Sequence, residues 1–212
     1  MKYEVKQGDC LSSVAAKYGF HWEALWNHAS NAKLKKKRKN PNVLYPGDIV
    51  NIPDKKPNAH STATGKNHQF KVKDNRVEFK LRVLRDGKLR AGEAFELDVD
   101  GRVISGTTDG DGWVIAKIPP TAREGELSLA DGKEQYKLAF GHIDPIDILS
   151  GIQGRLKNMG FFLGEVDGKN SAALKNAIRR FQAKQGLDET GEADQATKDK
   201  IVEAYEGGPL LP

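Results

Sequence analysis

The chain has 212 residues, of which 38% are hydrophobic, 30% charged and 8% aromatic. This composition is typical of folded globular proteins and excludes a disordered or collagen-like chain. At about 100 to 200 residues per domain, the length allows one or two domains, or three small ones, and excludes a large barrel. The longest apolar run is Trp113–Ala116. Since a transmembrane helix needs about 20 apolar residues, we expect no membrane insertion.

The net charge of +5 is concentrated in the first part of the chain. Residues 1–60 hold 11 lysines and arginines against 5 aspartates and glutamates, whereas residues 143–212 hold 9 against 11. Much of the excess lies in a basic run, which consists of Lys33 and residues 35–39. Such a run could contact nucleic acid or an anionic polymer, but no aromatic side chains interleave with it to stack on bases. We therefore expect a solvated loop or helix end and no nucleic-acid partner.

Two shifts in composition divide the chain. Residues 54–67 show no hydrophobic periodicity and are rich in Pro, Gly, Ser, Thr and Asn, which is typical of a flexible linker. A second, shorter joint lies at residues 141–145. We expect a multidomain α+β protein with a first module at residues 1–54, a linker at 55–67, a middle module at 68–141 and a third module at 143–207.

The first module has the pattern of a βααβ unit. Residues 3–6 alternate as a strand, apolar residues from Leu11 to Tyr18 follow helical spacing, a second helix is expected at about residues 22–28, and residues 48–52 return as a strand. Three motifs follow in order: Tyr3-x-Val5-x-x-Gly8-Asp9-x-Leu11, Trp22-x-x-Leu25-x-Asn27 and Asn42-x-Leu44-Tyr45-Pro46-Gly47-Asp48. Together they resemble the LysM domain, which binds N-acetylglucosamine-containing glycans such as peptidoglycan and chitin.

The resemblance implies a shallow glycan groove between two loops. Carried over to this sequence, the loops consist of Gly8, Asp9, Cys10 and Leu11, and of Asn42, Val43, Leu44, Tyr45 and Pro46. Backbone N–H and C=O groups in such loops can pair with an acetamido group without any charge. Cys10 stands where the family usually has Thr or Ser, which removes a helix-capping hydroxyl. The residues Gly8-Asp9 taken alone are also compatible with a strand-to-helix turn that has no binding role.

The middle module has the pattern of a small antiparallel β-sandwich. Residues 77–83 alternate strictly between apolar and charged, and Asp-Gly turns recur at residues 86–87, 100–101, 109–112 and 131–132. Residues 106–113 followed by Ile118-Pro119-Pro120 resemble an Ig-like domain of the carboxypeptidase-regulatory type. The aspartates at 98, 100, 109 and 111 lack the spacing of a twelve-residue calcium loop, so we interpret them as turn residues. We expect a spacer or docking role.

The third module has three stretches of helical spacing, predicting a three-helix domain. Its motifs are Ile152-Gln153-x-x-Leu156-x-x-x-Gly160-Phe161, Gly164-x-Val166-Asp167-Gly168, Phe181-Gln182-x-x-x-Gly186-Leu187 and Gly191-x-x-Asp194-x-x-Thr197. They resemble the peptidoglycan-binding domain that is often appended to cell-wall hydrolases. The resemblance implies a second glycan site with Phe162, Asp167, Gly168 and Asn170. The chain departs from the family at Asn170, Ser171 and Leu174, positions that line the groove in the family.

The sequence shows no catalytic centre. The five histidines include no His-Glu-x-x-His motif, and the single Cys10 allows neither a disulfide nor a cysteine-cluster metal site, so we expect no catalytic residues, metal or cofactor. Cys10 could form a nucleophilic Cys-His pair with His21 or His28, but that pair would lie inside a small binding module, so we do not interpret it as catalytic.

The expected function is noncatalytic binding of peptidoglycan or a chitin-like glycan by two weak modules acting through avidity. The alternative is a docking protein, because the order of modules resembles accessory proteins of bacterial type VI secretion or contractile injection systems. The first residues lack the apolar stretch of a secretory signal. We therefore expect synthesis in the cytoplasm and action at the cell wall or periplasm after delivery by a nonclassical route.

Overall fold

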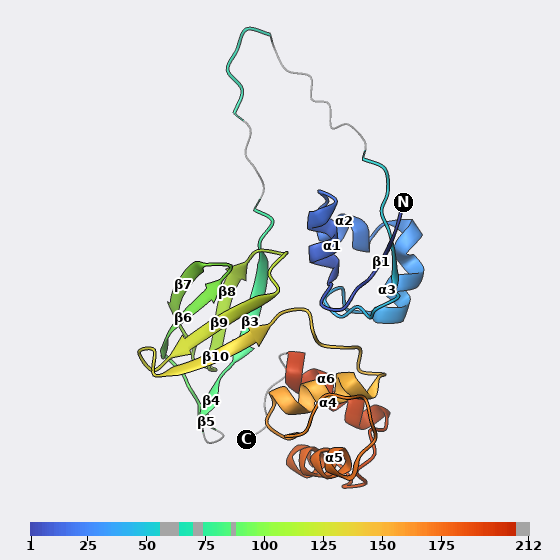
Figure 1. Cartoon of the computed structure of the whole chain (residues 1–212), viewed down its shortest axis with the longest axis vertical. Coiled ribbons are helices and arrows are strands. Elements are labelled where there is room, and N and C mark those ends of the chain that lie inside the picture. The colour runs from blue at the N-terminus through green and yellow to red at the C-terminus, as the bar shows by residue number, and fades with distance from the viewer. Residues whose placement is uncertain (56–63, 70–73, 86–87, 207–212) are drawn as a thin grey trace. The chain divides into compact units, whose positions relative to one another are not determined.

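The computed structural model describes residues 1–55, 64–69, 74–85 and 88–206. They form two compact units, residues 1–42 with 46–141 and residues 43–45 with 142–212. The first unit contains helices and small antiparallel sheets and the second contains helices, so the chain is a multidomain α+β protein as expected (Figure 1). The linker expected at residues 55–67 and the Asp86-Gly87 turn lie largely or wholly outside the described residues. None of the described helices has the length and apolar content needed to span a bilayer.

The first group of elements follows the βααβ plan with additional helical residues. Strand β1 (Lys2–Glu4) pairs antiparallel with β2 (Ile49–Asn51), and between them lie α1 (Leu11–Lys17), α2 (Trp22–Trp26), a 3-10 turn η1 (Ala29–Asn31) and α3 (Ala32–Arg38). The basic run, expected as a loop or helix end, thus forms most of a short helix. Lysine and arginine are good helix formers, and Leu34, which is 7% exposed, fixes α3 to the core.

A buried asparagine ties these helices to the sheet. Asn31 is 1% exposed, and its Nδ2 donates to the carbonyl oxygens of Leu25 at 3.0 Å and Asn51 at 2.8 Å. Its Oδ1 accepts from the Asn51 N–H at 2.7 Å. Because each polar atom of this buried amide has a partner, Asn31 fixes the end of α2 against β2 at little desolvation cost.

The middle elements form the expected antiparallel strands. Four strands lie side by side in the order β10 (Glu134–Ala139), β9 (Glu124–Leu129), β6 (Ala94–Val99) and β7 (Arg102–Thr107) (Figure 1). A second sheet pairs β3 (Val77–Arg82) with β8 (Trp113–Ile118), and β4 (Leu84–Arg85) pairs with β5 (Lys88–Leu89). The inward residues of β6, β8 and β9 share one core, which includes Leu97, Val114 and Leu127, all 0% exposed. Asp109 Oδ1 accepts from the N–H groups of Asp111 and Trp113, which confirms its interpretation as a turn residue.

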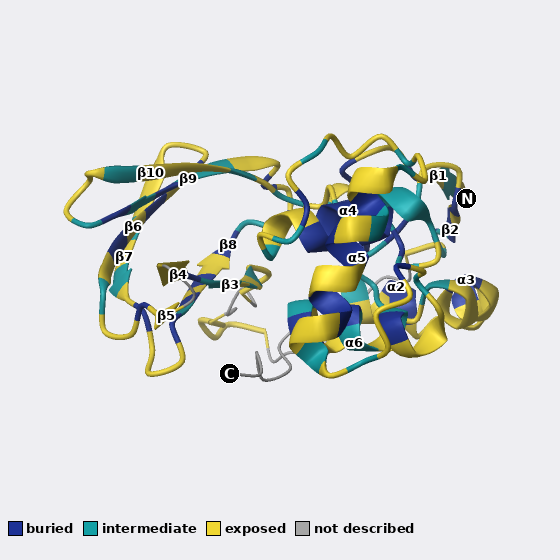
Figure 2. Ribbon diagram, turned by 90° about the horizontal axis from the view of Figure 1, so that it is seen from below, coloured by how far each residue is buried: buried dark blue, intermediate teal, exposed yellow. Residues whose placement is uncertain are grey.

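The second unit contains three helices around one core. They are α4 (Leu149–Asn158), α5 (Ala172–Gln185) and α6 (Gln195–Glu206), and Figure 2 shows their buried and exposed stripes. Arg155 is 1% exposed and donates to the carbonyl oxygens of Asp144 at 2.7 Å and Gly151 at 3.0 Å. Burial lowers the pKa of this guanidinium. Gly151 lies so close to the segment before α4 that a Cβ there would stand 2.0 Å from the Pro145 oxygen.

Candidate functional site

The loop between β1 and α1 is shaped by its own aspartate. Gly8 has a φ of 81°, and the Asp9 carboxylate accepts hydrogen bonds from the Tyr3 hydroxyl at 2.8 Å and the Lys6 N–H at 2.9 Å. Burial opposes ionisation of Asp9, but the hydrogen bonds from the Lys6 N–H, from the Arg123 guanidinium at 2.5 Å and from the Tyr3 hydroxyl outweigh it and hold its pKa below the usual value. Burial, together with the bond to Asp9, raises the pKa of Tyr3 to about 12. Asp9 therefore holds the loop in shape.

At the start of α1 the side chain of Ser13 accepts a hydrogen bond from the backbone of the N-cap residue. Cys10 is the N-cap, is partly exposed, and its N–H donates to Ser13 Oγ at 3.1 Å. Leu11 is 0% exposed, and its N–H donates to the Pro41 carbonyl at 3.0 Å. In this structure the Leu11 side chain is thus buried and its N–H is already hydrogen-bonded. The bond to Pro41 instead joins the first loop to the start of the second.

The second loop exposes only some of its expected residues. Asn42 and Pro46 are exposed, Val43 and Tyr45 are partly buried, and Leu44 is 5% exposed. The Asn42 N–H donates to Asn40 Oδ1 at 2.9 Å, which fixes the turn. The side chains of Asn42 and Pro46 are thus exposed, Tyr45 is partly exposed and Leu44 is buried.

The basic run is divided between structural and outward-facing cations. Arg38 is buried and makes a bidentate ion pair with Asp48, Nε to Oδ2 at 2.5 Å and Nη2 to Oδ1 at 2.9 Å, and Lys37 joins at 3.1 Å. Lys35 donates to Asn27 Oδ1 at 2.7 Å. The remaining members, Lys33, Lys36 and Lys39, are exposed and make no ion pair with the described residues; we call them the outer lysines.

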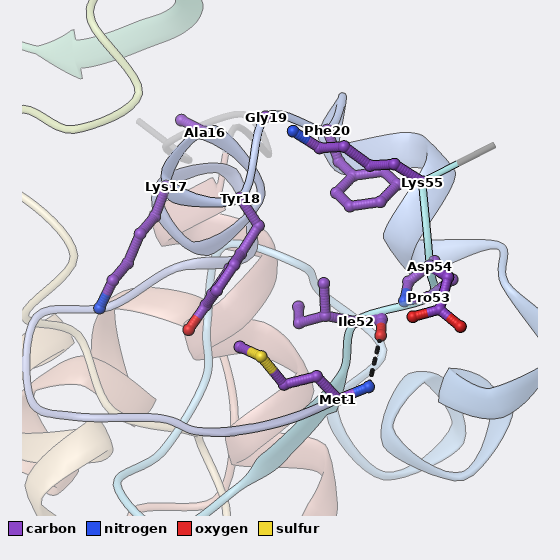
Figure 3. A pocket seen from close by; sticks show the side chains of 10 residues that line it. All are labelled: Met1, Ala16, Lys17, Tyr18, Gly19, Phe20, Ile52, Pro53, Asp54 and Lys55. Carbon is purple, nitrogen blue, oxygen red and sulfur yellow. Dashed lines mark hydrogen bonds between the residues drawn. The ribbon is translucent and has the colours of Figure 1, made fainter. Parts of the chain in front are cut away.

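A shallow hollow lies at the opposite end of α1 from the two loops. It is lined by the end of α1 and the residues after β2, including Tyr18, Phe20, Ile52 and Lys55 (Figure 3). Figure 3 also shows the Met1 ammonium, which donates to the Ile52 carbonyl at 2.9 Å. The hollow contains none of the expected glycan residues.

In the second unit, a buried glutamine clamps the loop before α5. Gln153 is 0% exposed, and its Nε2 donates to Asp167 Oδ1 at 2.9 Å and the Lys169 carbonyl at 3.1 Å. Its Oε1 accepts from the Gly168 N–H at 2.7 Å, and Gly168 has a φ of 72°. The Lys169 N–H and the Gln153 amide lower the pKa of Asp167. Two expected site residues, Asp167 and Gly168, are therefore held in place by Gln153, which the sequence identifies only as part of a motif.

A second glutamine makes the same set of bonds to the loop before α6. Gln182 is 1% exposed, its Oε1 accepts from the Gly191 N–H at 2.9 Å, and its Nε2 donates to Thr190 Oγ1 at 3.1 Å and the Glu192 carbonyl at 3.0 Å. In both clamps the glutamine binds a glycine N–H, the following carbonyl and the preceding side chain.

Comparison with known families now assigns the two glycan-binding segments. Residues 3–53 match the LysM domain, and residues 149–201 match a peptidoglycan binding domain. The chain carries a LysM domain and a peptidoglycan-binding domain. The resemblances to the LysM domain and to the peptidoglycan-binding domain are thereby confirmed, and both matched domains are binding modules. No family match covers the middle strands among these findings, and no solved structure matches the chain.

A lytic enzyme matches one segment of this chain. The chain is 42% identical over 53 residues to a spore cortex-lytic enzyme of Oceanobacillus iheyensis. The match covers 25% of this chain and 19% of that relative. It therefore spans a module and far less than the length of the lytic enzyme.

The peptidoglycan-binding domain places one expected contact residue, Phe162, in its core. Phe162 is 3% exposed, and its ring packs so closely on Gly164 that a Cβ there would stand 2.6 Å away. The Phe162 side chain is therefore packed inside the domain in this structure. Leu174 is 0% exposed and Ser171 caps α5, its Oγ accepting from the Leu174 N–H. The departures from the family at these two positions thus concern packing and capping, while Asn170 is exposed.

The described residues contain no cluster of metal-ligating side chains. Among them, no group of three or more histidine, cysteine, aspartate or glutamate side chains is placed to hold a metal ion. The LysM histidines interact with their own neighbours: His21 Nδ1 lies 3.4 Å from Glu23, and His28 Nδ1 lies 2.7 Å from Ser30 Oγ. Neither imidazole has a hydrogen bond with Cys10 in the part of the chain that the structure describes.

Proposed function

We propose that the protein is a noncatalytic peptidoglycan binder that attaches to the wall through its LysM domain and its peptidoglycan-binding domain together. The observation that carries the proposal is the presence of two wall-binding families in a single chain, at residues 3–53 and 149–201. On a polymer that repeats one disaccharide, the second contact becomes intramolecular. Linkage then strengthens binding by about 10²-fold or more over either module alone.

The contact residues follow from exposure within the family-matched loops. In the LysM domain we assign the first contacts to Asn42, Tyr45 and Pro46, with the backbone of Gly8 and Cys10 completing the site. In the peptidoglycan-binding domain we assign them to Asn170 and to the loop that Gln153 clamps. Uncharged groups suit a neutral sugar, since an acetamido group needs hydrogen bonds and no ion pair.

Sedimentation of the full chain with insoluble peptidoglycan tests this proposal. We expect Tyr45→Ala and Asn170→Ala each to weaken retention and the double variant to lose it. The matched controls are Tyr136→Ala in β10 and Asn75→Ala before β3, which change exposed residues outside both matched domains. Full retention of the double variant, or equal losses in the controls, would contradict the assignment of the sites.

We also propose that the chain itself performs no cleavage, although the relative is named as a lytic enzyme. Both matched segments of this chain are binding modules. Incubation of the chain with purified peptidoglycan should release no soluble muropeptides. A docking role in a secretion or injection machine remains the second proposal, and it is favoured by the middle strands, which lie outside both family matches.

A further inference from the structure

One end of the middle sandwich holds a small apolar pocket with a basic rim. Its volume is about 190 Å³, and its walls include Val99 at the end of β6, Ile104 of β7 and Pro119 after β8. Arg76, Arg102 and Lys117 also line it. The pocket is separate from every glycan-binding residue assigned above. Its volume is of the order of one apolar side chain.

Two of the three rim cations lack a counter-ion. Arg76 is already paired with Asp74, from Nε at 3.0 Å and from Nη2 at 2.9 Å. Neither Arg102 nor Lys117 forms an ion pair or side-chain hydrogen bond with any residue that the structure describes.

The acid nearest to Lys117 in register is engaged elsewhere. Glu78 stands opposite Lys117 across the β3–β8 pair, but it lies 3.1 Å from Lys80. Asp74 acts on Lys117 electrostatically without an ion pair between them. The rim therefore favours an occupant that carries negative charge beside an apolar group.

The pocket also lies beside an open sheet edge. β7 is the last strand of its sheet and, among the described residues, pairs only with β6 (Figure 1). In that pairing Arg102 stands opposite Val99 and Ile104 opposite Leu97, so both side chains share the inner face of the sheet. An extended segment added along β7 would pair its backbone with the edge and place an inward side chain at the pocket.

We propose that this edge and pocket form a docking site for an acidic, extended peptide segment of a partner protein. The segment pairs with the free edge of β7, inserts one apolar side chain against Val99 and Ile104, and places its flanking carboxylates near Arg102 and Lys117. The middle module then supplies a protein contact while the two flanking domains hold the wall. The proposal does not depend on which glycan they bind.

Titration of the full chain with a synthetic peptide, followed by NMR, tests the proposal. The probe is a capped hexapeptide that alternates aspartate with leucine, and the control peptides carry asparagine for aspartate or serine for leucine. We expect the probe to shift amides at Val99, residues 102–104 and Lys117, and both controls to bind more weakly. Amides of β7 should also gain protection from hydrogen exchange.

A pair of charge variants separates the site from general electrostatics. Arg102→Gln with Lys117→Gln should weaken peptide binding about fivefold, as expected for two exposed ion pairs. Lys133→Gln with Lys137→Gln removes the same charge from exposed positions elsewhere in the module and should leave binding unchanged. Equal losses in both pairs would overturn the proposal. So would equal binding of the asparagine peptide, or shifts of these amides by soluble muropeptides and not by the probe.

Discussion

The clamp formed by Gln153 gives a quantitative test of how the loop at residues 167–169 is held. Gln153→Met keeps the size of the side chain but removes its three hydrogen bonds to this loop. At about 0.5 to 1.5 kcal/mol for each bond, and more where a buried group is left without a partner, the loss is about 2 to 4 kcal/mol. For a domain of about 60 to 100 residues this lowers Tm by roughly 10 to 25 °C.

The assay can separate this domain from the rest of the chain. All three tryptophans, at positions 22, 26 and 113, lie outside residues 142–212. The loss should therefore appear in the helical circular-dichroism signal, while the transition seen by tryptophan fluorescence stays unchanged. A loss below about 1 kcal/mol would refute the reasoning, since it would mean that water replaces the clamp at no cost.

The charged variant Gln153→Glu adds a pH dependence with a defined sign. It places a buried carboxylate against Asp167 and the Lys169 carbonyl, which raises its folded-state pKa above the unfolded value of about 4.3. A raised carboxyl pKa adds no penalty below the unfolded pKa and an increasing penalty as the pH rises toward the folded pKa. The variant should therefore lose more stability at pH 7.5 than at pH 4.5. Equal losses at both values would contradict this account.

Three further predictions concern the rest of the chain. Asp48→Asn leaves the buried Arg38 side chain without its anion and should destabilise the LysM domain by about 3 to 5 kcal/mol, measured by tryptophan-detected urea unfolding. The control Lys37→Gln changes a side chain that is 63% exposed and should cost below about 1 kcal/mol. Circular dichroism should show that Gly151→Ala leaves the three-helix domain unfolded at ambient temperature. The control Gly154→Ala places a Cβ that would meet only a side-chain methyl at 3.3 Å, so this variant should melt near the wild-type temperature. Replacing the outer lysines with glutamine should flatten the salt dependence of peptidoglycan sedimentation, and an unchanged salt profile would show that they make no contact with the wall.

The parts of the fold that follow a simple period were predictable from the sequence. The alternation of residues 77–83 predicted a half-buried strand, and β3 covers Val77–Arg82 with Phe79 and Leu81 packed against the core. The helical spacing of the third module likewise predicted α4, α5 and α6. In these segments each side chain faces core or solvent according to its position alone.

Most of the contacts that the sequence did not predict lie outside the periodic segments. The helix α3 has a single buried apolar residue, Leu34, and the partner of its Arg38 is Asp48, ten residues away. No local pattern reveals that pairing. Phe162 follows a helix end in a turn-rich loop, where hydrophobicity alone does not tell a core residue from a ligand contact. The two clamps share one feature in the sequence: a glutamine directly follows an apolar residue of a predicted helix, at Ile152-Gln153 and Phe181-Gln182. Both apolar residues are buried in the structure.

The two glutamine clamps make the peptidoglycan-binding domain an internal repeat. Each unit consists of a helix that carries a glutamine, a glycine whose N–H that glutamine binds, and a residue that caps the next helix. The cap stands three residues after the glycine: Ser171 follows Gly168, and Asp194 follows Gly191. Helix α5 ends the first unit and begins the second, which is how repeat proteins extend a stack one unit at a time. In α6 the residue after the buried Ile201 is Val202. Valine has no side-chain amide that could bind a loop, so α6 does not repeat the glutamine clamp.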